Sequence, residues 1–333
     1  MRGSPDARAL HRACPPIDLH ADTLMWSRWL GYDLLARHQP PLWRAACGGH
    51  VDVPRMRDGG LGAQFFSLVS VPVSRTAGGL AQAVEEQIDV LSDVIERGPT
   101  DLRLVRTASE IDECRKKGIL GALLGIEGAH ALEGDLDRIE TFARRGVRYL
   151  GLLHFTANDA GYPAYGRGRR DEQGLTAWGR ELVRRCEGCG VIVDLAHINR
   201  RGFLDACAAA SKPLMVSHTG VLGAFEHWRN IGDDQLRAVA QGGGVVGVVF
   251  YPRYLGGPGL DSVVKHILHI VDVVGEDTPA LGSDWDGLIV PTHELSDPGG
   301  LPLLTDALLK ARVPARIIEK ILRRNVMRLL SEA

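Results

Sequence analysis

Short apolar runs alternate with longer amphipathic segments along this chain, and this alternation limits its possible folds more than any other feature. Eight runs of aliphatic and β-branched residues, each bounded by Gly, Pro or polar residues, predict strands at residues 17–19, 62–69, 121–126, 149–154, 191–195, 213–217, 245–250 and 278–282. Helical periodicity is clearest at residues 80–96, 136–144, 176–187, 201–209, 233–240, 260–273, 301–310 and 314–330. Strands that alternate with helices predict a parallel sheet.

The closed form of such a sheet, a (β/α)8 TIM barrel, is the fold that we expect. Runs such as 121–126 and 245–250 are continuously apolar, as strands buried on both faces should be. A doubly wound open sheet is the alternative, but it usually has a Gly-rich phosphate turn after its first strand, where this chain has His20-Ala-Asp22. The triple glycine at 242–244 precedes a strand and predicts a turn between helix and strand.

The length of 333 residues suits a single barrel, and no linker or internal repeat divides the chain. We therefore expect one catalytic domain over residues 1–333. Within it, the Trp-bearing excursion 24–60 is expected to cover one end of the barrel, and residues 312–333 are expected to form a C-terminal helix.

Composition excludes several classes of protein. The 39 Lys and Arg residues are balanced by 41 Asp and Glu, so the formal charge of -2 offers no field for holding nucleic acid. No apolar stretch approaches the roughly 20 residues that span a membrane. The six cysteines are sparse and the first residues do not resemble a secretion signal, so we expect a soluble protein of the reducing cytoplasm.

Acidic residues and histidines follow the predicted strands where each strand ends. In a barrel of this type the carboxyl ends of all strands meet at one rim, and that rim carries the chemistry. The residues concerned are His20 and Asp22, Glu127, His154, Asp194 and His197, His218, and Asp284 and Asp286. A random distribution would not place so many of these residues at strand ends. Their common position at one rim of the barrel therefore predicts a single site.

The residue types at this rim predict a metal centre. His20 and Asp22 are two residues apart on an extended segment, so both side chains point to the same side and can hold one cation. His197 and His218 follow neighbouring strands and can hold a second cation, with Glu127 as the natural bridge. Imidazole and carboxylate ligands suit zinc or a similar divalent metal, and a pair of metals can activate a shared water.

The role of Asp194 stays open at this point, because it can support a ligand or only satisfy backbone donors.

An ordered series of segments resembles the renal or membrane dipeptidases, peptidase family M19 of the metal-dependent amidohydrolase superfamily. The resemblance covers nearly the whole chain; each segment is weak alone, but the ordered set is specific. Its segments include Ile17-Asp-Leu-His-Ala-Asp-Thr, Gly125-Ile-Glu-Gly, Leu152-Leu-His-Phe-Thr, Val193-Asp-Leu-Ala-His, Val216-Ser-His, Arg229-Asn and Gly282-Ser-Asp-Trp-Asp-Gly.

The resemblance implies a role for each residue of the site. One zinc is held by His20, Asp22 and Glu127, and the other by Glu127, His197 and His218. It also implies that His154 lies beside the scissile carbonyl and that Arg229 binds the free carboxylate of a dipeptide, for which a planar guanidinium is well suited.

Asp284 is then the general base and acid that takes a proton from the bridging water and returns it to the leaving amine. Asp286 is the rival for this role, although its position favours capping the next turn.

The chain departs from the family pattern at Thr219-Gly220, after the histidine of the sixth strand. The charged loop 162–173 is either solvated or able to select acidic side chains.

These features together predict a dinuclear zinc dipeptidase for small dipeptides with a free C-terminal carboxylate. From the resemblance, we expect it to tolerate a D-residue at the C-terminal position. The alternatives are a metal-dependent hydrolase of another amide, such as an N-acyl amino acid or a lactam, a phosphate esterase, and a pathway protein that no longer catalyses. Other divalent metals are possible, and a homodimer would be ordinary for such an enzyme.

Overall fold

Eight parallel strands close into a barrel, as the alternation predicts. The computed structural model describes residues 2–38, 48–70 and 79–333. Pairing of β2 with β4 closes the ring, in the order β2-β1-β9-β8-β7-β6-β5-β4. The strands of the barrel are β1 Ile17–Ala21, β2 Ala63–Val69, β4 Leu120–Glu127, β5 Val147–Gly151, β6 Ile192–Asp194, β7 Met215–Thr219, β8 Val245–Val248 and β9 Pro279–Leu281. The predicted (β/α)8 fold is confirmed.

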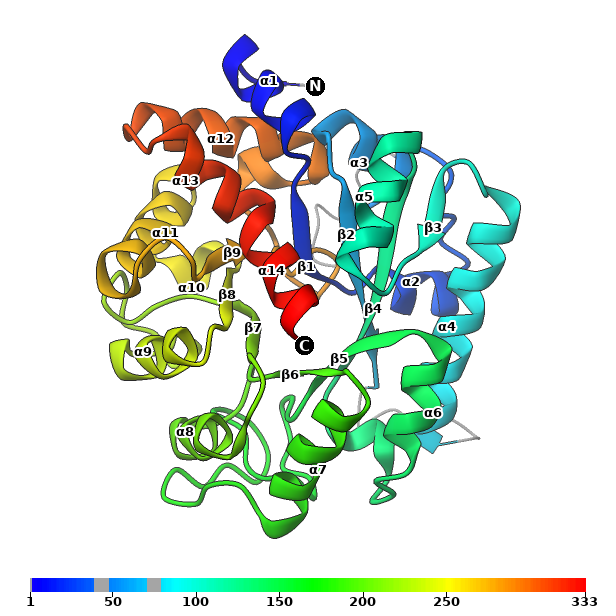
Figure 1. Ribbon diagram of the computed structural model, residues 1–333, viewed down its shortest axis with the longest axis vertical. Coiled ribbons are helices and arrows are strands. Elements are labelled where there is room, and N and C mark those ends of the chain that lie inside the picture. Colours follow the sequence, from blue (N-terminus) through cyan, green and yellow to red (C-terminus); the bar gives the residue numbers. More distant parts are fainter. Residues whose placement is uncertain (1, 39–47, 71–78) are drawn as a thin grey trace.

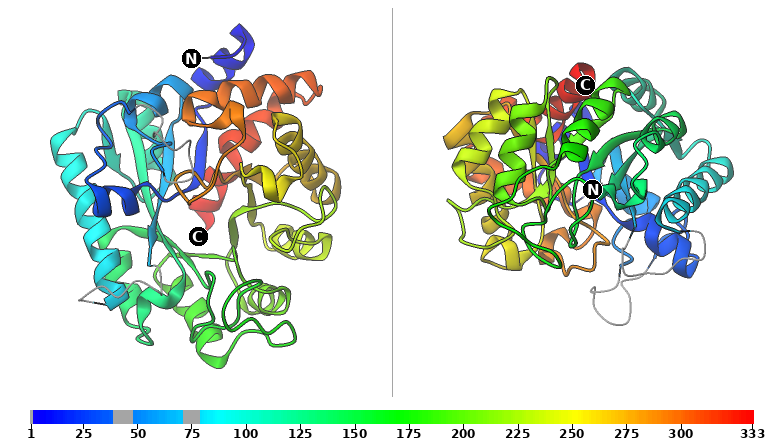
Figure 2. Two further views of the ribbon diagram at one scale, coloured as in Figure 1. Left: turned by 180° about the vertical axis from the view of Figure 1, so that it is seen from behind. Right: turned by 90° about the horizontal axis from the view of Figure 1, so that it is seen from below.

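Helices surround the strands on all sides (Figures 1 and 2). Those that follow strands as predicted are α4 Gly79–Arg97, α6 Arg138–Arg145, α7 Ala177–Gly188, α8 Arg200–Ala209, α9 Asp233–Gln241, α11 Leu260–Val274 and α12 Leu301–Lys310. Each buries one apolar face against the strands, which leaves the rims of the barrel to loops. Among the described residues, no helix is both long and apolar enough to cross a membrane.

Several short elements were not predicted. They are α1 Pro5–Ala13, α2 Thr23–Leu30, α3 Val53–Gly59, the strand β3 Leu102–Leu104, α5 Ala108–Lys117, α10 Pro252–Leu255 and three 3-10 turns, Ala129–Leu132, His293–Leu295 and Pro298–Gly300. The helix α5 shows why periodicity missed them, because it buries only Ile111 and Cys114 and depends on a capping box between Thr107 and Glu110.

One strand boundary matters for the site. The strand β5 ends at Gly151, so His154 lies three residues beyond it and not at the end of a strand that reaches residue 154, as predicted. The side chain of Asn158 donates to the backbone oxygen of Leu152 over 2.9 Å, which holds the chain in a loop at this point.

The C-terminal segment closes the amino end of the barrel, and Figure 1 shows it lying across the ring of strands. It consists of α13 Ala315–Glu319, a π-helical turn Lys320–Arg324 and α14 Asn325–Glu332, where the sequence predicts a single helix. Val326, Leu329 and Leu330 pack in one apolar cluster with the first residues of the strands, among them Ile17 and Ala63. Apolar side chains therefore fill this end of the barrel.

The excursion 24–60 is tied to the loop after β9 by Asp286. One carboxylate oxygen of Asp286 accepts a hydrogen bond from the Thr23 hydroxyl (2.5 Å) and the other from the backbone N–H of His50 (2.7 Å). Its backbone oxygen accepts from the indole of Trp26 over 2.7 Å. Instead of capping the following turn, the buried Asp286 therefore holds the described parts of this excursion in place; residues 39–47 lie outside the described residues.

Candidate active site

The rim opposite α14 collects the side chains that the sequence singled out. His20 lies on β1, Glu127 ends β4 and His218 lies on β7. Asp22 directly follows β1. His197 lies in the loop after β6, and Asp284 lies in the loop after β9. His197 and Asp284 have φ angles of 66° and 63°, an uncommon left-handed backbone that turns each side chain back toward the barrel axis.

Glu127 lies at the centre of the site and belongs to two groups of possible metal ligands. The first consists of His20, Asp22 and Glu127, and the second of Glu127, His197 and His218; in each group the ligand atoms lie within 4.8 Å of one another. The Oε1 atom of Glu127 is 3.1 Å from Nε2 of His197, 3.6 Å from Nε2 of His218 and 3.7 Å from Nε2 of His20. One oxygen of this carboxylate thus faces three imidazoles.

The electrostatics of this cluster favour a bound cation. Burial raises the pKa of Glu127 well above its ordinary value, and the carboxylate of Asp22 raises it further. Burial lowers the pKa of His20, but the carboxylates of Asp22, Glu127 and Asp284 outweigh this effect and raise it to about 10. Nε2 of His20 and Oδ1 of Asp22 are buried 3.3 Å apart, and neither atom forms a hydrogen bond with any other described residue. Buried imidazole and carboxylate donor atoms that lie this close together fit a divalent metal.

Asp284 can act in two ways. Burial raises its pKa to about 7, with His20 and Arg229 acting in the opposite direction, so the carboxylate can accept and return a proton near neutral pH. It also forms a third group of possible ligands with His20 and His218. The backbone N–H of Asp284 donates to the backbone oxygen of His20 over 3.1 Å, which holds these two residues together.

Tyr149, which the sequence pattern did not single out, orients His20. Its hydroxyl lies 2.9 Å from Nδ1 of His20, so the Nε2 atom is left to face the carboxylates. The ring fills the barrel interior beside Gly125, where an added Cβ would lie 2.0 Å from the ring atoms. A tyrosine at the start of the apolar run 149–153 is the signal that could have pointed to this role.

A chain of hydrogen bonds orients His218. Nδ1 of His218 lies 2.9 Å from the Ser217 hydroxyl, which in turn donates to Oδ2 of Asp194 over 2.6 Å. Oδ1 of Asp194 accepts from the backbone N–H groups of Ser217 (2.7 Å) and Ala196 (3.0 Å). The structure thus places Asp194 in both of the roles that the sequence left open: it supports a candidate ligand and satisfies backbone donors.

His154 and Arg229 lie at the same cavity. Nε2 of His154 is 3.6 Å from Oε2 of Glu127, and burial lowers the pKa of His154 to about 3, so its imidazole is neutral. Arg229 is buried and one terminal nitrogen donates to the backbone oxygen of His218 over 2.8 Å. The Nε atom of Arg229 has no hydrogen-bond partner among the described residues, so the guanidinium retains donors for a ligand.

These side chains line a cavity of about 290 Å3, which suits a small ligand. Its lining is formed by Asp22, Met25, Val69, Glu127, His154, Phe155, His197, His218, Arg229, Tyr251, Tyr254, Asp284, Gly287, Leu288 and Ile289. The apolar members were not predicted, because they come from α2, the end of β2, α10 and several loops, which only closure of the barrel brings together. None of the charged residues of loop 162–173 is among the lining residues; Arg169 pairs with Asp171 instead.

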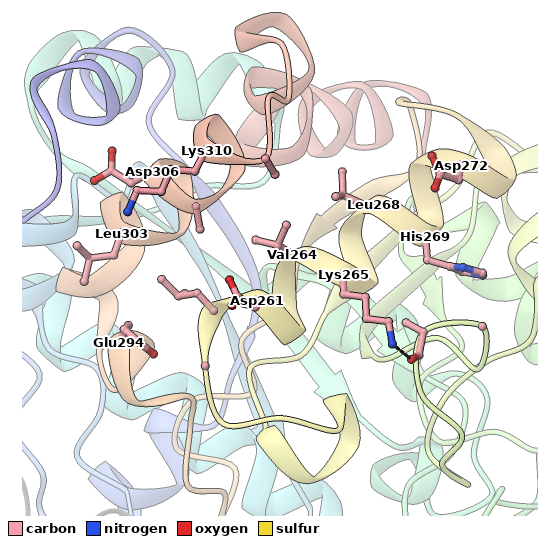
Figure 3. A pocket seen from close by; sticks show the side chains of 16 residues that line it. Asp261, Val264, Lys265, Leu268, His269, Asp272, Glu294, Leu303, Asp306 and Lys310 are labelled. Carbon is pink, nitrogen blue, oxygen red and sulfur yellow. Dashed lines mark hydrogen bonds between the residues drawn. The ribbon is translucent and has the colours of Figure 1, made fainter.

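A larger hollow of about 920 Å3 lies outside the barrel between α11 and α12. Figure 3 shows lysines and acidic residues around it, with Lys265 turned toward a backbone oxygen. None of the groups of possible metal ligands found among the described residues lies there. The smaller cavity at the strand ends is therefore the candidate active site.

The Asp194–Ser217–His218 chain leads to a testable prediction about metal binding. Replacing Ser217 with Ala removes the hydrogen-bond partner of His218 Nδ1 and frees the ring to rotate, so we expect metal affinity at one site to fall about 10- to 100-fold. Zinc affinity is measured by competition with a chromophoric chelator. Ser27→Ala, which removes another buried serine hydroxyl far from this chain of bonds, is the matched control. Equal affinities in the two variants would show that Ser217 does not position the ligand.

Comparison with known proteins identifies the family of this chain. The sequence profile of the membrane dipeptidases (peptidase family M19) matches residues 5–333. The chain is 34% identical to an uncharacterized protein encoded in the pqqA 5' region of Klebsiella pneumoniae, over 74% of this chain and 94% of that protein. It is 30% identical to the dipeptidase tcpJ of Claviceps purpurea, over 85% of this chain and 69% of that one.

A solved structure extends the similarity to three dimensions. A metallopeptidase of Rhodobacter sphaeroides, crystallised with a phosphinate mimic of the dipeptide L-Ala-D-Ala, superposes with a TM-score of 0.84 at 25% identity. The superposition covers 96% of this chain and 99% of that protein. With a family profile that spans almost all of the sequence and a barrel that carries a cluster of possible metal ligands, the chain belongs to the membrane dipeptidase family M19, whose members are metal-dependent hydrolases of dipeptides.

Proposed function

We propose that this protein is a dinuclear zinc dipeptidase that hydrolyses small dipeptides with a free C-terminal carboxylate. The observation that carries the proposal is one small cavity in which two groups of ligands share Glu127 while a buried arginine, Arg229, lies in the same wall. A substrate that fits must place a carbonyl at the ligand cluster and a negative charge at the guanidinium. A dipeptide meets both requirements.

The roles of the metal ligands follow from their grouping. His20, Asp22 and Glu127 would hold one zinc ion, and Glu127, His197 and His218 the other. When bound, such ions make a water nucleophilic at neutral pH and polarise the carbonyl that it attacks. Tyr149 and Ser217 keep the imidazoles of His20 and His218 oriented for this task.

The other residues bind the substrate and move the proton. Arg229 pairs with the terminal carboxylate, and its burial strengthens that pair because water does not compete for it. His154 is neutral and can donate its ring N–H to the carbonyl oxygen as negative charge develops there. The carboxylate of Asp284 accepts a proton from the attacking water and returns it to the nitrogen of the leaving amine.

Tolerance of a D-residue at the C-terminal position is part of the proposal. It is supported by the Rhodobacter sphaeroides relative, whose bound phosphinate mimics L-Ala-D-Ala. L- and D-residues differ in which of two positions on the α-carbon holds the side chain and which holds the hydrogen. A cavity with room at both positions would accept either residue.

The direct test is metal content together with dipeptide hydrolysis on one purified sample. We expect about two zinc ions per chain and cleavage of both L,L and L,D dipeptides that a chelator abolishes and added zinc restores. Two metals with turnover of N-acyl amino acids or lactams alone would assign the site to another amide. Metal with turnover of phosphate esters alone would assign it to that reaction. Absence of metal after reconstitution would refute the mechanism.

Arg229 supplies a test of the carboxylate clamp. In Arg229→Ala, a dipeptide loses a charge-assisted contact in a buried site, so we expect kcat/KM to fall about 100-fold or more. A C-terminally amidated dipeptide lacks the carboxylate, and its much lower turnover should change by less than about threefold. Both rates are measured for wild type, Arg229→Ala and the charge-retaining Arg229→Lys. Equal losses on the two substrates would mean that Arg229 does not bind the carboxylate.

Asp284 is tested by separating turnover from metal content. In Asp284→Asn the side chain keeps its shape but cannot take up a proton, so we expect kcat to fall about 100- to 10,000-fold while two zinc ions remain bound. Metal content by atomic absorption and kcat are measured on the same preparation. Loss of one zinc ion would assign Asp284 to the third group of ligands, with His20 and His218, instead of to proton transfer.

A further inference from the structure

The walls of the active-site cavity carry information about the side chains of the substrate. Every charged or imidazole side chain that lines the cavity already has a role in metal binding, proton transfer or carboxylate binding. Apart from Gly287, the remaining lining residues are apolar or aromatic, including Phe155, Tyr251, Tyr254 and Leu288. An ionised substrate side chain would thus leave water and meet no free opposite charge, with only the hydroxyls of Tyr251 and Tyr254 as polar partners, whereas an apolar one would gain by burial.

Leu288 is the most unusual of these residues. Its side chain is 60% exposed, although it is a large apolar group, and its φ angle of 59° lies in the left-handed region that leucine rarely adopts. Both features are unfavourable in the free protein. Backbone strain of this kind occurs at functional sites, and an apolar ligand in the cavity would cover the exposed side chain.

Phe155 forms another part of the cavity wall. It is 39% exposed, and its ring meets the rings of His154 and His197 at centroid distances of 4.6 and 4.8 Å. These contacts hold an apolar ring next to the ligand cluster, so a substrate side chain near the scissile bond would meet an aromatic surface.

The aromatic wall continues outward from the cavity. The rings of Tyr254 and Trp228 pack edge to face with their centroids 5.7 Å apart, and the ring of Trp228 stacks on that of Tyr165 with a centroid distance of 4.3 Å. Trp228 and Tyr165 are 39% and 50% exposed. This row of rings leads from the cavity to the surface and offers apolar contact to a side chain that is too long for the cavity itself.

We infer that the substrates are dipeptides that carry a large apolar or aromatic side chain, and that Leu288 and Phe155 determine this specificity. The inference rests on the proposed dipeptidase function and narrows its substrate class. It also argues against selection of acidic side chains by loop 162–173, because the arginines of that loop do not line the cavity.

The loop after β9 provides a matched pair of variants. Leu288 lines the cavity, whereas Val290, two residues away and 48% exposed, does not. Leu288→Asn removes the apolar surface and suits the left-handed backbone, so the variant should fold at least as well as wild type. Val290→Asn removes a similar exposed apolar group outside the cavity. Melting temperatures of both variants check that neither change acts through folding.

The experiment measures kcat/KM on two series of dipeptides, Xaa-Ala and Ala-Xaa, with Ala, Leu, Phe, Asp and Lys as Xaa. In at least one series we expect wild type to prefer Leu and Phe over Asp and Lys by about tenfold or more. In Leu288→Asn the ratio of Leu to Ala turnover in that series should fall about tenfold, since the methyl groups of one side chain are lost from the contact. In Val290→Asn the ratio should stay within about twofold.

Two results would overturn the inference: Asp or Lys substrates that match Leu in both series, or equal changes of the ratio in the two variants. These failures differ from failure of the proposed function. In that case wild type would cleave none of the dipeptides, including Ala-Ala, and no ratio would exist.

Discussion

Buried negative charge at one end of the barrel is the constraint on which the rest of this structure depends. Asp22, Glu127, Asp194 and Asp284 are all buried near the carboxyl ends of the strands, and Asp18 is buried on β1 beside Ser283 of the loop after β9. Removing so many carboxylates from water is costly unless positive charge or hydrogen-bond donors compensate for it. Asp18 and Asp194 are satisfied by donors from neighbouring strands, such as Ser283 and Ser217, whereas the other three face the imidazoles.

This division explains why two kinds of acidic residue occur at the same rim. The carboxylates of Asp18 and Asp194, which accept hydrogen bonds from neighbouring segments, have a structural role: they join these segments and orient adjacent side chains. Asp22, Glu127 and Asp284 lie close together beside the imidazoles, where a bound cation would compensate for their charge; the same carboxylates raise the pKa of His20. Because the cation binds only where closure of the barrel brings β1, β4 and β7 together, metal binding and stability of the folded chain are coupled.

The two ends of the barrel differ in the polarity of their side chains. Apolar residues of α14 fill the end where the strands begin, so that end contributes stability. Polar and charged residues fill the other end, where loops are free to differ in length and composition. Cavity walls such as Leu288 and Phe155 come from these loops, whereas His20, Glu127 and His218 lie on strands.

The sequence by itself determined the barrel and most of the chemistry. Alternating strands and helices specified the fold, and strand periodicity placed His20, Asp22, Glu127 and His218 at one rim. These are local properties of the chain, which follow from hydrophobic period and residue type. Short capped helices such as α5 could not be predicted from periodicity, because the signal that specifies them lies in hydrogen bonds at their ends.

Only the tertiary structure decided how these residues meet. His20 and Glu127 are more than a hundred positions apart, and closure of the ring brings their side chains to 3.7 Å. It also revealed Tyr149 and Ser217 as partners of the imidazoles, and it showed that Asp286 supports the excursion 24–60 instead of capping the following turn. Such contacts depend on packing between segments that are distant in the sequence, and no local pattern encodes this packing. The hydrophobic pattern of a strand, in contrast, can be recognised from the few residues of that strand alone.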